Sequence, residues 1–233
     1  MAGGLGTRLR PLTEETPKPM VNVLGKPFLE YVIGMLKEKG FDKFVICSSY
    51  KNEKIRDYFG NGSKFGVTIG HSVEATPLGT AGAIRNALFY LEGKFMVING
   101  DTYLDIDYSN IYEKFGAKKE AALMVLYSGK EIKERVDNVS IDGNGLVTSF
   151  DKGNEMQSKY GWAGVLLLMK SAVEKWSPRM SLSLEKDVFP GLIEKGLVDS
   201  FITKTKYYDI GTAEKLNDFT QFIMGKKIKP GGD

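Results

Sequence analysis

FMVINGD, residues 95–101, is an apolar run that ends abruptly in a polar turn. A short, wholly apolar segment of this kind is typical of a strand buried on both faces of a sheet. Around it, apolar runs predict strands at 43–48 and 67–73, and amphipathic stretches predict helices at 28–39, 52–59 and 80–91. This alternation is typical of βαβ units, whose strands form a parallel sheet with helices on both faces.

The pattern changes after about residue 120, where strands follow one another with fewer helices between them. The predicted strands are 121–127, 139–141, 146–150, 164–169 and 198–203, and the predicted helices are 186–195 and 213–224. The DGNG run at 142–145 predicts a tight hairpin turn. We therefore expect a Rossmann-like, three-layer α/β/α fold with a mixed, mostly parallel central sheet. The domain would span 1–225 and end in a flexible tail at 226–233.

The composition excludes several classes of function. The 32 basic and 29 acidic side chains are mixed along 233 residues, so the net charge of +3 indicates neither a nucleic-acid nor a membrane partner. No apolar run approaches the roughly 20 residues that span a bilayer, and no signal peptide is visible. We therefore expect a cytoplasmic protein. Cys47 is the single cysteine and His71 the single histidine, which excludes an intrachain disulfide and a histidine-based triad, and both are interpreted as structural.

A glycine-rich segment, AGGLGTRLRP at 2–11, combines three glycines with two arginines. Glycines let backbone N–H groups approach a phosphate chain, and arginines bind phosphate oxygens in pairs. TPKPM at 16–20 follows, and its two prolines restrict the backbone around Lys18. Together the two segments predict a phosphate site. Neither GxxxxGK[ST] nor the GxGxxG of dinucleotide-binding dehydrogenases is present.

The start of this loop is unusual. Such loops normally leave the carboxyl end of a central strand, but the glycines here begin at residue 3. Either the sequence as given lacks a first strand, or the loop is supported in another way. We favour the first interpretation, which would lower stability.

Two aspartates follow predicted strands. Asp101 ends the run at 95–101, and Asp209 lies in YDIG at 208–211. In an open α/β sheet, ligands bind at the carboxyl ends of the strands. Carboxylates there suit Mg²⁺, which keeps few protein ligands and bridges substrate phosphates. Each aspartate alone is as consistent with a turn or helix cap as with a metal ligand. As a pair beside a phosphate loop, the two favour a metal site.

Five motifs in order along the chain resemble the sugar-nucleotidyltransferase family: GGLGTRLRPLT with TPKPM, PLGTAGAI, NGD, EKDVFP and YDIG. The resemblance covers essentially the whole chain. EATPLGTAGA at 74–83 and SLEKDVFP at 183–190 are most similar to guanylyltransferases. SYK at 49–51, YF at 58–59 and DTYLDID at 101–107 are most similar to enzymes acting on manno-heptose 1-phosphate.

The resemblance implies Mg²⁺-dependent transfer of a nucleoside monophosphate, with GTP favoured, to a sugar 1-phosphate, giving an NDP-sugar and pyrophosphate. The half 1–110 would bind the nucleotide and the half 111–225 the sugar phosphate. The implied residues are Gly3, Gly4, Gly6 and Thr7 around the triphosphate, Leu78, Gly79 and Thr80 against the base, Arg8 and Lys18 on pyrophosphate, Asp101 and Asp209 on Mg²⁺, Lys152 on the sugar phosphate, and Gly164 and Glu185 near the sugar. No general base is needed, because the attacking phosphate is already an anion.

Three departures from the family cluster on the sugar side. Gly153 follows Lys152 where the family has proline, Trp162 replaces an asparagine, and Asp137 stands where the family has glycine. These changes indicate an unusual sugar or a weakened sugar site. Trp162 would either stack on a sugar face or pack in the core.

Two alternatives stay open at this point. The nucleotide could instead be UTP, dTTP or CTP, because the family reads the base largely through backbone groups. The chain could be a non-catalytic relative that binds a sugar nucleotide and regulates a partner enzyme. A short enzyme of this kind would act alone or as a homodimer on small-molecule substrates.

Overall fold

The computed structural model describes residues 1–4, 6–116, 120–129, 137–152, 159–178 and 181–228. Its helices are α1 (Phe28–Glu38), α2 (Asn52–Phe59), α3 (Gly79–Asn86), α4 (Tyr108–Lys114), α5 (Lys170–Val173), α6 (Phe189–Glu194) and α7 (Ala213–Ile228). Its strands are β1 (Asn22–Val23), β2 (Lys26–Pro27), β3 (Lys43–Ser48), β4 (Thr68–Val73), β5 (Lys94–Ile98), β6 (Thr102–Tyr103), β7 (Ala122–Tyr127), β8 (Asp137–Ile141), β9 (Val147–Lys152), β10 (Gly161–Met169), β11 (Val198–Thr203) and β12 (Tyr208–Asp209).

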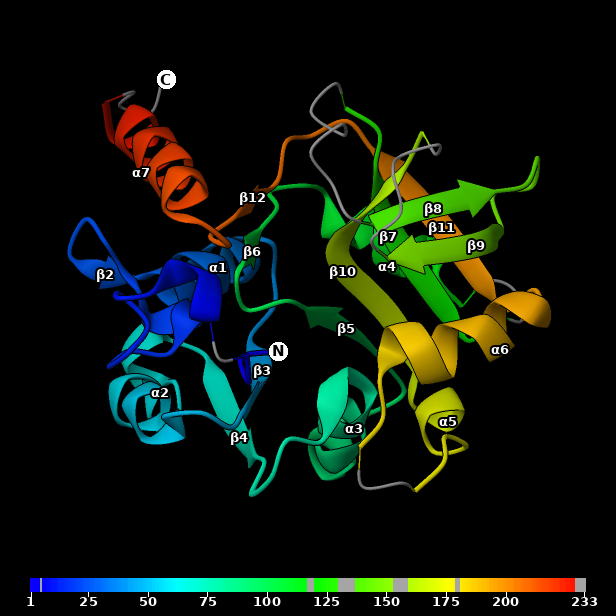
Figure 1. Cartoon of the computed structure of the whole chain (residues 1–233), viewed down its shortest axis with the longest axis horizontal. Helices are drawn as coiled ribbons and strands as arrows, with labels where there is room; N and C mark the ends of the chain where they lie inside the picture. The colour runs from blue at the N-terminus through cyan, green and yellow to red at the C-terminus, as the bar shows by residue number, and fades with distance from the viewer. Residues whose placement is uncertain (5, 117–119, 130–136, 153–158, 179–180, 229–233) are drawn as a thin grey trace.

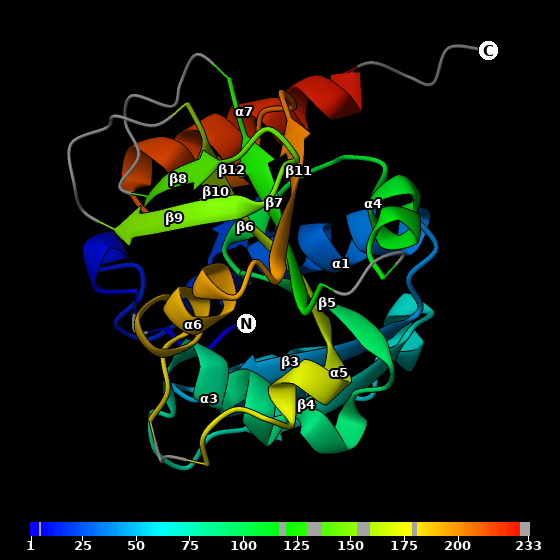
Figure 2. The same ribbon diagram turned by 90° about the vertical axis from the view of Figure 1, so that its right-hand side faces the viewer.

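Strand β7 shows how the layers arise. All six of its residues are buried, and they point alternately into two separate apolar cores. Leu123 and Val125 join the core that contains α1, α2, α4 and α7, whereas Met124 and Leu126 join the core that contains α3, α5 and α6. Successive strand residues face opposite sides of a sheet, so helices cover both faces (Figures 1 and 2). The predicted three-layer α/β/α fold is confirmed.

The central sheet is mixed. Four strands pair in the order β11-β7-β10-β5, and β3 pairs with β4. The β11–β7 and β3–β4 pairings are parallel, whereas β10 runs antiparallel to both β7 and β5. Strand β10 therefore joins the first half of the chain to the second within one sheet.

Most predicted elements are confirmed, several with shifted bounds, and two predicted helices are each divided into two parts. The strands at 43–48 and 198–203 and the helix at 52–59 have the predicted bounds. The helix predicted at 80–91 is α3 followed by a 3₁₀ turn at Leu88–Tyr90. The helix predicted at 186–195 is a π turn at Leu184–Val188 followed by α6, because Pro190 lacks the N–H that a continuous α-helix needs.

The predicted hairpin turn and the predicted last helix are both present in the second half of the chain. The DGNG hairpin joins β8 to β9, and Asp142 Oδ1 accepts hydrogen bonds from the N–H groups of Asn144 and Leu146. Helix α7 continues past the predicted end at 224, to Ile228. Residues 229–233, part of the expected tail, lie outside the described residues.

Backbone hydrogen bonds of Met1 and Ala2 support the glycine loop, as in the second of the two interpretations. Ala2 N–H donates to Cys47 O on β3 (2.7 Å), and the Met1 amine donates to Ile98 O on β5 (2.8 Å). Gly100 N–H donates back to Met1 O (2.7 Å). The loop thus starts from backbone bonds to β3 and β5. A cavity of about 910 Å³ lies beside Met1, between α1, β3 and β5.

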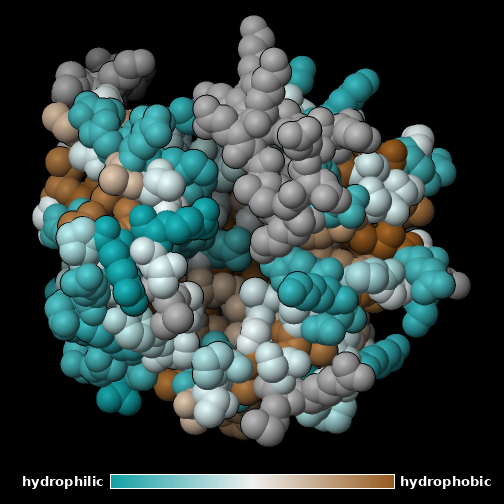
Figure 3. All heavy atoms as spheres, in the orientation of Figure 1, coloured by the Kyte–Doolittle hydropathy of each residue, from teal (hydrophilic) through white to brown (hydrophobic). Residues whose placement is uncertain are grey.

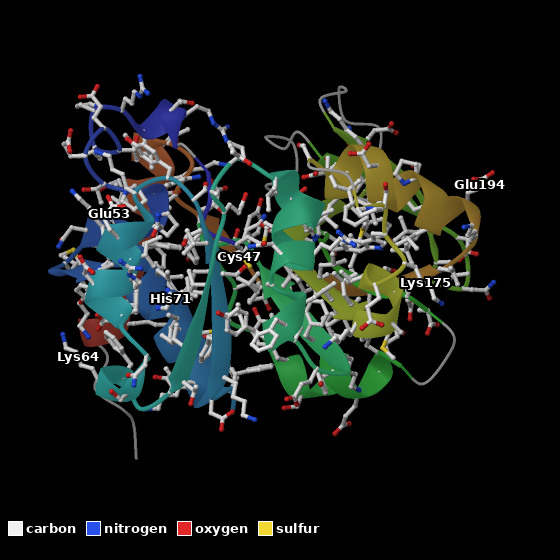
Figure 4. The ribbon with its side chains drawn as sticks, turned by 90° about the horizontal axis from the view of Figure 1, so that it is seen from below. Cys47, Glu53, Lys64, His71, Lys175 and Glu194 are labelled. Carbon is white, nitrogen blue, oxygen red and sulfur yellow. The ribbon has the colours of Figure 1, made fainter. Side chains whose placement is uncertain are left out.

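The two residues interpreted as structural are Cys47 on β3 and His71 on β4, both labelled in Figure 4. Burial raises the pKa of the Cys47 thiol, which keeps it protonated. The His71 Nε2–H donates to Gly60 O (2.7 Å). Hydrophilic residues cover much of the face shown in Figure 3. Within the described part of the chain, no helix has both the length and the apolar character to cross a membrane.

Asp105 ties the end of α1 to the end of α7. Its carboxylate pairs with Lys39 (2.9 Å) and with Lys226 of α7 (2.7 Å), whose ammonium also donates to the Tyr103 hydroxyl (3.2 Å). Partial burial opposes ionisation of Asp105, but the hydrogen bonds from Lys226 and Lys39 outweigh it and lower the pKa of the carboxyl.

We expect Asp105→Asn to lower the free energy of unfolding by about 1 kcal/mol at pH 7, because the ion pairs are partly exposed to solvent. The pKa of Asp105 is lowered in the folded state, so its stabilisation is present at neutral pH and lost as the pH falls below about 4. Urea unfolding at pH 7 and at acid pH measures both effects. Asp57→Asn, at an exposed residue of α2, is the control. A variant as stable as the wild type at pH 7 would contradict this role.

Candidate active site

The glycine loop is held by side chains from outside it. The Ser49 hydroxyl donates to Gly3 O (2.8 Å), and the Thr13 hydroxyl donates to Gly6 O (2.8 Å). Gly6 has a positive φ of 62°, and a Cβ there would lie 3.0 Å from the Thr13 side chain and 3.1 Å from Lys18 Cβ. The loop therefore requires glycine at this position. A 3₁₀ turn at Thr7–Leu9 follows.

Lys18 and Asp101 form an ion pair, although 83 residues separate them in sequence. Lys18 begins the 3₁₀ turn Lys18–Met20, and prolines lie on both sides of it. Its side chain is only 12% exposed. The proline-bracketed lysine thus presents a fixed cation to the carboxylate that ends the central β5 segment.

A short strand pairing brings Asp209 beside Asp101. Strand β12 runs antiparallel to β6, with Asp209 opposite Thr102, and Ile210 N–H donates to Asp101 O (3.2 Å). The Asp209 carboxylate accepts from Gly211 N–H at Oδ1 (2.8 Å) and from the Lys215 ammonium at Oδ2 (2.7 Å). The two predicted metal ligands therefore lie on adjacent backbone segments.

The donor set fits Mg²⁺. Among the described residues no cluster of three or more His, Cys, Asp or Glu side chains is present. Asp101 and Asp209 supply two carboxylates, and Mg²⁺ typically takes one or two from protein and completes its shell with water and substrate phosphates. One oxygen of each carboxylate, Oδ2, pairs with an ammonium group, Asp101 with Lys18 and Asp209 with Lys215.

Arg8, Lys18 and Asp209 all lie close to Gly211. A Cβ at Gly211 would lie 2.7 Å from Asp209 Oδ1, and 3.8 Å from both the Arg8 guanidinium and Lys18 Nζ. Arg8 is exposed and has no ion-pair partner in the parts of the chain that the structure describes. It is available to bind a ligand anion.

The predicted base-binding segment at 78–80 is hydrogen-bonded to residues 184 and 185. Leu78 N–H donates to Glu74 Oε2 (2.9 Å). The Thr80 hydroxyl donates to Glu185 Oε2 (3.0 Å) and accepts from Leu184 N–H (2.8 Å). PLGTAGAI and SLEKDVFP, which the sequence singled out separately, therefore form one wall.

These elements enclose a cleft of about 600 Å³. The predicted residues that line it are Gly3, Gly4, Arg8, Lys18, Gly79, Thr80, Asp101, Gly164, Glu185 and Asp209. Gly6, Thr7 and Leu78 lie in the same loops but not in the lining. Lys152 ends β9, and its side chain lies outside the described residues. Glu74 and Lys215 also line the cleft, and no sequence motif predicted a role for them.

Of the three positions that depart from the family pattern, the structure describes the side chain of Trp162 alone. The Trp162 indole is 8% exposed, donates to Val165 O (2.9 Å) and packs edge-on against Phe189. It is a core residue that also borders the cleft, so the packed alternative is the one that the structure supports. Asp137 begins β8, but its side chain lies outside the described residues. Gly153 lies wholly outside them.

Gly164 lies at an irregularity in β10. The register of β10 against β7 shifts between Trp162 and Leu166, and Gly164 has a φ of +75°. Its carbonyl accepts from Asn99 N–H (3.0 Å), and a Cβ would lie 2.9 Å from the Thr102 hydroxyl. The bulge thus brings β10 backbone against the turn that carries Asp101.

We expect Gly79→Ala to lower the free energy of unfolding by about 1–3 kcal/mol. Gly79 has a φ of +75°, and a Cβ there would lie 2.6 Å from Leu182 O, so the two segments of this wall must separate. Gly34→Ala in α1 is the matched control, because its Cβ meets nothing within 4 Å. Urea unfolding of both variants checks this, and equal stability of Gly79→Ala and wild type would refute it.

Comparison with known proteins places this site in a family. The Nucleotidyl transferase family matches residues 1–226. The D-glycero-alpha-D-manno-heptose 1-phosphate guanylyltransferase of Campylobacter jejuni is 34% identical over 96% of this chain and 97% of its own. The UTP–glucose-1-phosphate uridylyltransferase of Synechocystis sp. is 27% identical over 97% of this chain and 62% of its own.

A solved structure agrees with this match. The crystal structure of HddC from Yersinia pseudotuberculosis complexed with GMP-PN has a TM-score of 0.83 and 32% identity to this chain, covering 95% of this chain and 96% of HddC. The sequence match and the fold both span nearly the whole chain. This protein is therefore a nucleotidyltransferase, a member of the Nucleotidyl transferase family.

Proposed function

We propose that this enzyme transfers a nucleoside monophosphate from a nucleoside triphosphate, with GTP preferred, to a sugar 1-phosphate. The observation that carries this proposal is the convergence of the glycine loop, Lys18, Asp101 and Asp209 on one cleft. Such a cleft offers backbone N–H groups and cations for a phosphate chain, and carboxylates for a divalent metal.

Asp101 and Asp209 would hold Mg²⁺, which when bound supplies positive charge next to the α-phosphate. Arg8 and Lys18 would bind the departing pyrophosphate, since Arg8 is exposed beside the loop and Lys18 lies next to Asp101. These cations neutralise the charge that moves onto the leaving group. The glycine loop would fix the triphosphate for in-line attack.

The reaction balances without a general base. A sugar-phosphate oxygen, already an anion at neutral pH, forms a bond to the α-phosphorus while the bond to the β-phosphate oxygen breaks. Pyrophosphate leaves with the electron pair of that bond. His71, the only histidine, does not line the cleft. Catalysis therefore rests on positioning and charge neutralisation.

GTP is the preferred nucleotide in this proposal. Its support is the guanylyltransferase name of the Campylobacter relative and the GMP-PN complex of HddC. The uridylyltransferase relative keeps UTP as the second candidate. Of the three predicted base-binding residues, Gly79 and Thr80 line the cleft and Leu78 does not, so few side chains there would select one base.

The proposal predicts pyrophosphate release that requires both substrates. The screen pairs GTP, UTP, dTTP, CTP and ATP with mannose, manno-heptose, glucose and N-acetylglucosamine 1-phosphates in the presence of Mg²⁺. We expect the largest release with GTP and mannose or manno-heptose 1-phosphate. Release with UTP alone would overturn the GTP preference. A folded, nucleotide-binding protein with no release across the panel would instead favour a regulatory relative that binds sugar nucleotides.

We expect Asp101→Asn to reduce turnover by about 10²–10³-fold, because the metal and Lys18 both lose a charged partner. Thermal unfolding of the variant establishes that the cleft remains folded. Asp57→Asn removes an exposed carboxylate of α2 that does not line the cleft and is the control. Turnover by Asp101→Asn within a few fold of wild type would remove Asp101 from the reaction.

A further inference from the structure

Lys215 lines the cleft, and the proposed reaction has not yet given it a role. It lies in the first turn of α7, where its N–H donates to the Thr212 hydroxyl (3.3 Å). Its ammonium donates to Asp209 Oδ2 (2.7 Å), and its side chain lines the cleft. It thus contacts the carboxylate that we propose as a metal ligand.

The position is electrostatically unfavourable for a lysine. The first turn of a helix carries a partial positive charge from its unpaired N–H groups, which repels cations and attracts anions. The Asp209 carboxylate offsets that repulsion through the ion pair. Lys215 therefore depends on an anion in the cleft for a favourable environment.

The two lysines of the cleft differ in freedom. Lys18 is 12% exposed and begins a turn bracketed by prolines, so its ammonium is fixed beside Asp101. Lys215 is 41% exposed and projects from a helix on a flexible stem. Lys215 can change partner by rotating its exposed side chain, whereas burial restricts the side chain of Lys18.

We propose that Lys215 is a further phosphate-binding residue: it competes with Mg²⁺ for Asp209, and it turns to the phosphate of the sugar 1-phosphate once Asp209 ligates the metal. Among the described residues Asp209 is the one anion that Lys215 contacts. A divalent cation on the same carboxylate repels the ammonium, so metal ligation weakens this ion pair. The incoming phosphate replaces it. The inference rests on the proposed function for the identity of this phosphate.

The arrangement of charge favours the sugar phosphate over the triphosphate as the second partner. Arg8 and Lys18 belong to the glycine loop and its neighbouring turn, where the triphosphate would bind. Lys215 approaches from α7, on the Oδ2 side of Asp209. Metal binding and sugar-phosphate binding are then coupled, because the metal releases the cation that the second substrate uses.

The first test measures metal binding without substrates. Mn²⁺ replaces Mg²⁺ as the probe, and electron paramagnetic resonance reports the free ion during titration of the protein. We expect Lys215→Met to bind Mn²⁺ about fivefold more tightly, because the competing ammonium is gone. Lys215→Arg should bind like wild type. Lys226→Met, on the same helix but paired with Asp105, is the matched control and should not change. Unchanged or weaker binding by Lys215→Met would overturn the competition.

The second test measures kinetics with the sugar 1-phosphate that gives turnover. We expect Lys215→Met to raise the KM for the sugar 1-phosphate about tenfold, with little change in the KM for the nucleotide, and Lys215→Arg to restore most of it. An effect confined to the nucleotide, or none, would overturn the phosphate role. If wild type shows no turnover with any pair, the proposed function fails, while the Mn²⁺ titration still decides the competition.

Discussion

The antiparallel insertion of β10 between β5 and β7 is the pairing on which the structure depends. Strand β10 pairs with β5 from Val165 to Met169 and with β7 at both of its ends, so it joins the halves of the chain. Its side chains alternate between the two cores, as those of β7 do. Without it, the loops of the first half and the strands of the second would have no common frame.

The same strand also shapes the cleft. Its bulge leaves Gly164 in a left-handed conformation against the turn that follows β5, where a side chain would collide with Thr102. That turn carries Asp101, and the β6–β12 pairing sets Asp209 beside it. One irregularity in a buried strand and one two-residue pairing therefore place both carboxylates. Lys18 and Lys215 then balance their charge from opposite segments of the chain.

Local signals in the sequence were sufficient for most elements and for the position of the glycine loop. The apolar run of β7 is buried on both faces, whereas in β5 only Val97 is buried. The DGNG turn supplies its own hydrogen bonds through Asp142. Glycine at Gly6 and Gly79 is required by backbone geometry that the motif preserves. The sequence did not predict a role for Lys215, because a lysine in the first turn of a helix has no distinguishing pattern. Its contact with Asp209 depends on how the chain folds between these two residues.

The sequence by itself determined the alternation of strands and helices, the enzyme family, and the residue types that phosphate and metal chemistry need, because these depend on periodicity and on short motifs. Only the tertiary structure decided which charges meet. The Lys18–Asp101 pair, the Thr80–Glu185 contact and the packing of Trp162 join segments far apart in sequence. Such contacts depend on strand order and on the bulge of β10, which no local pattern of side chains encodes.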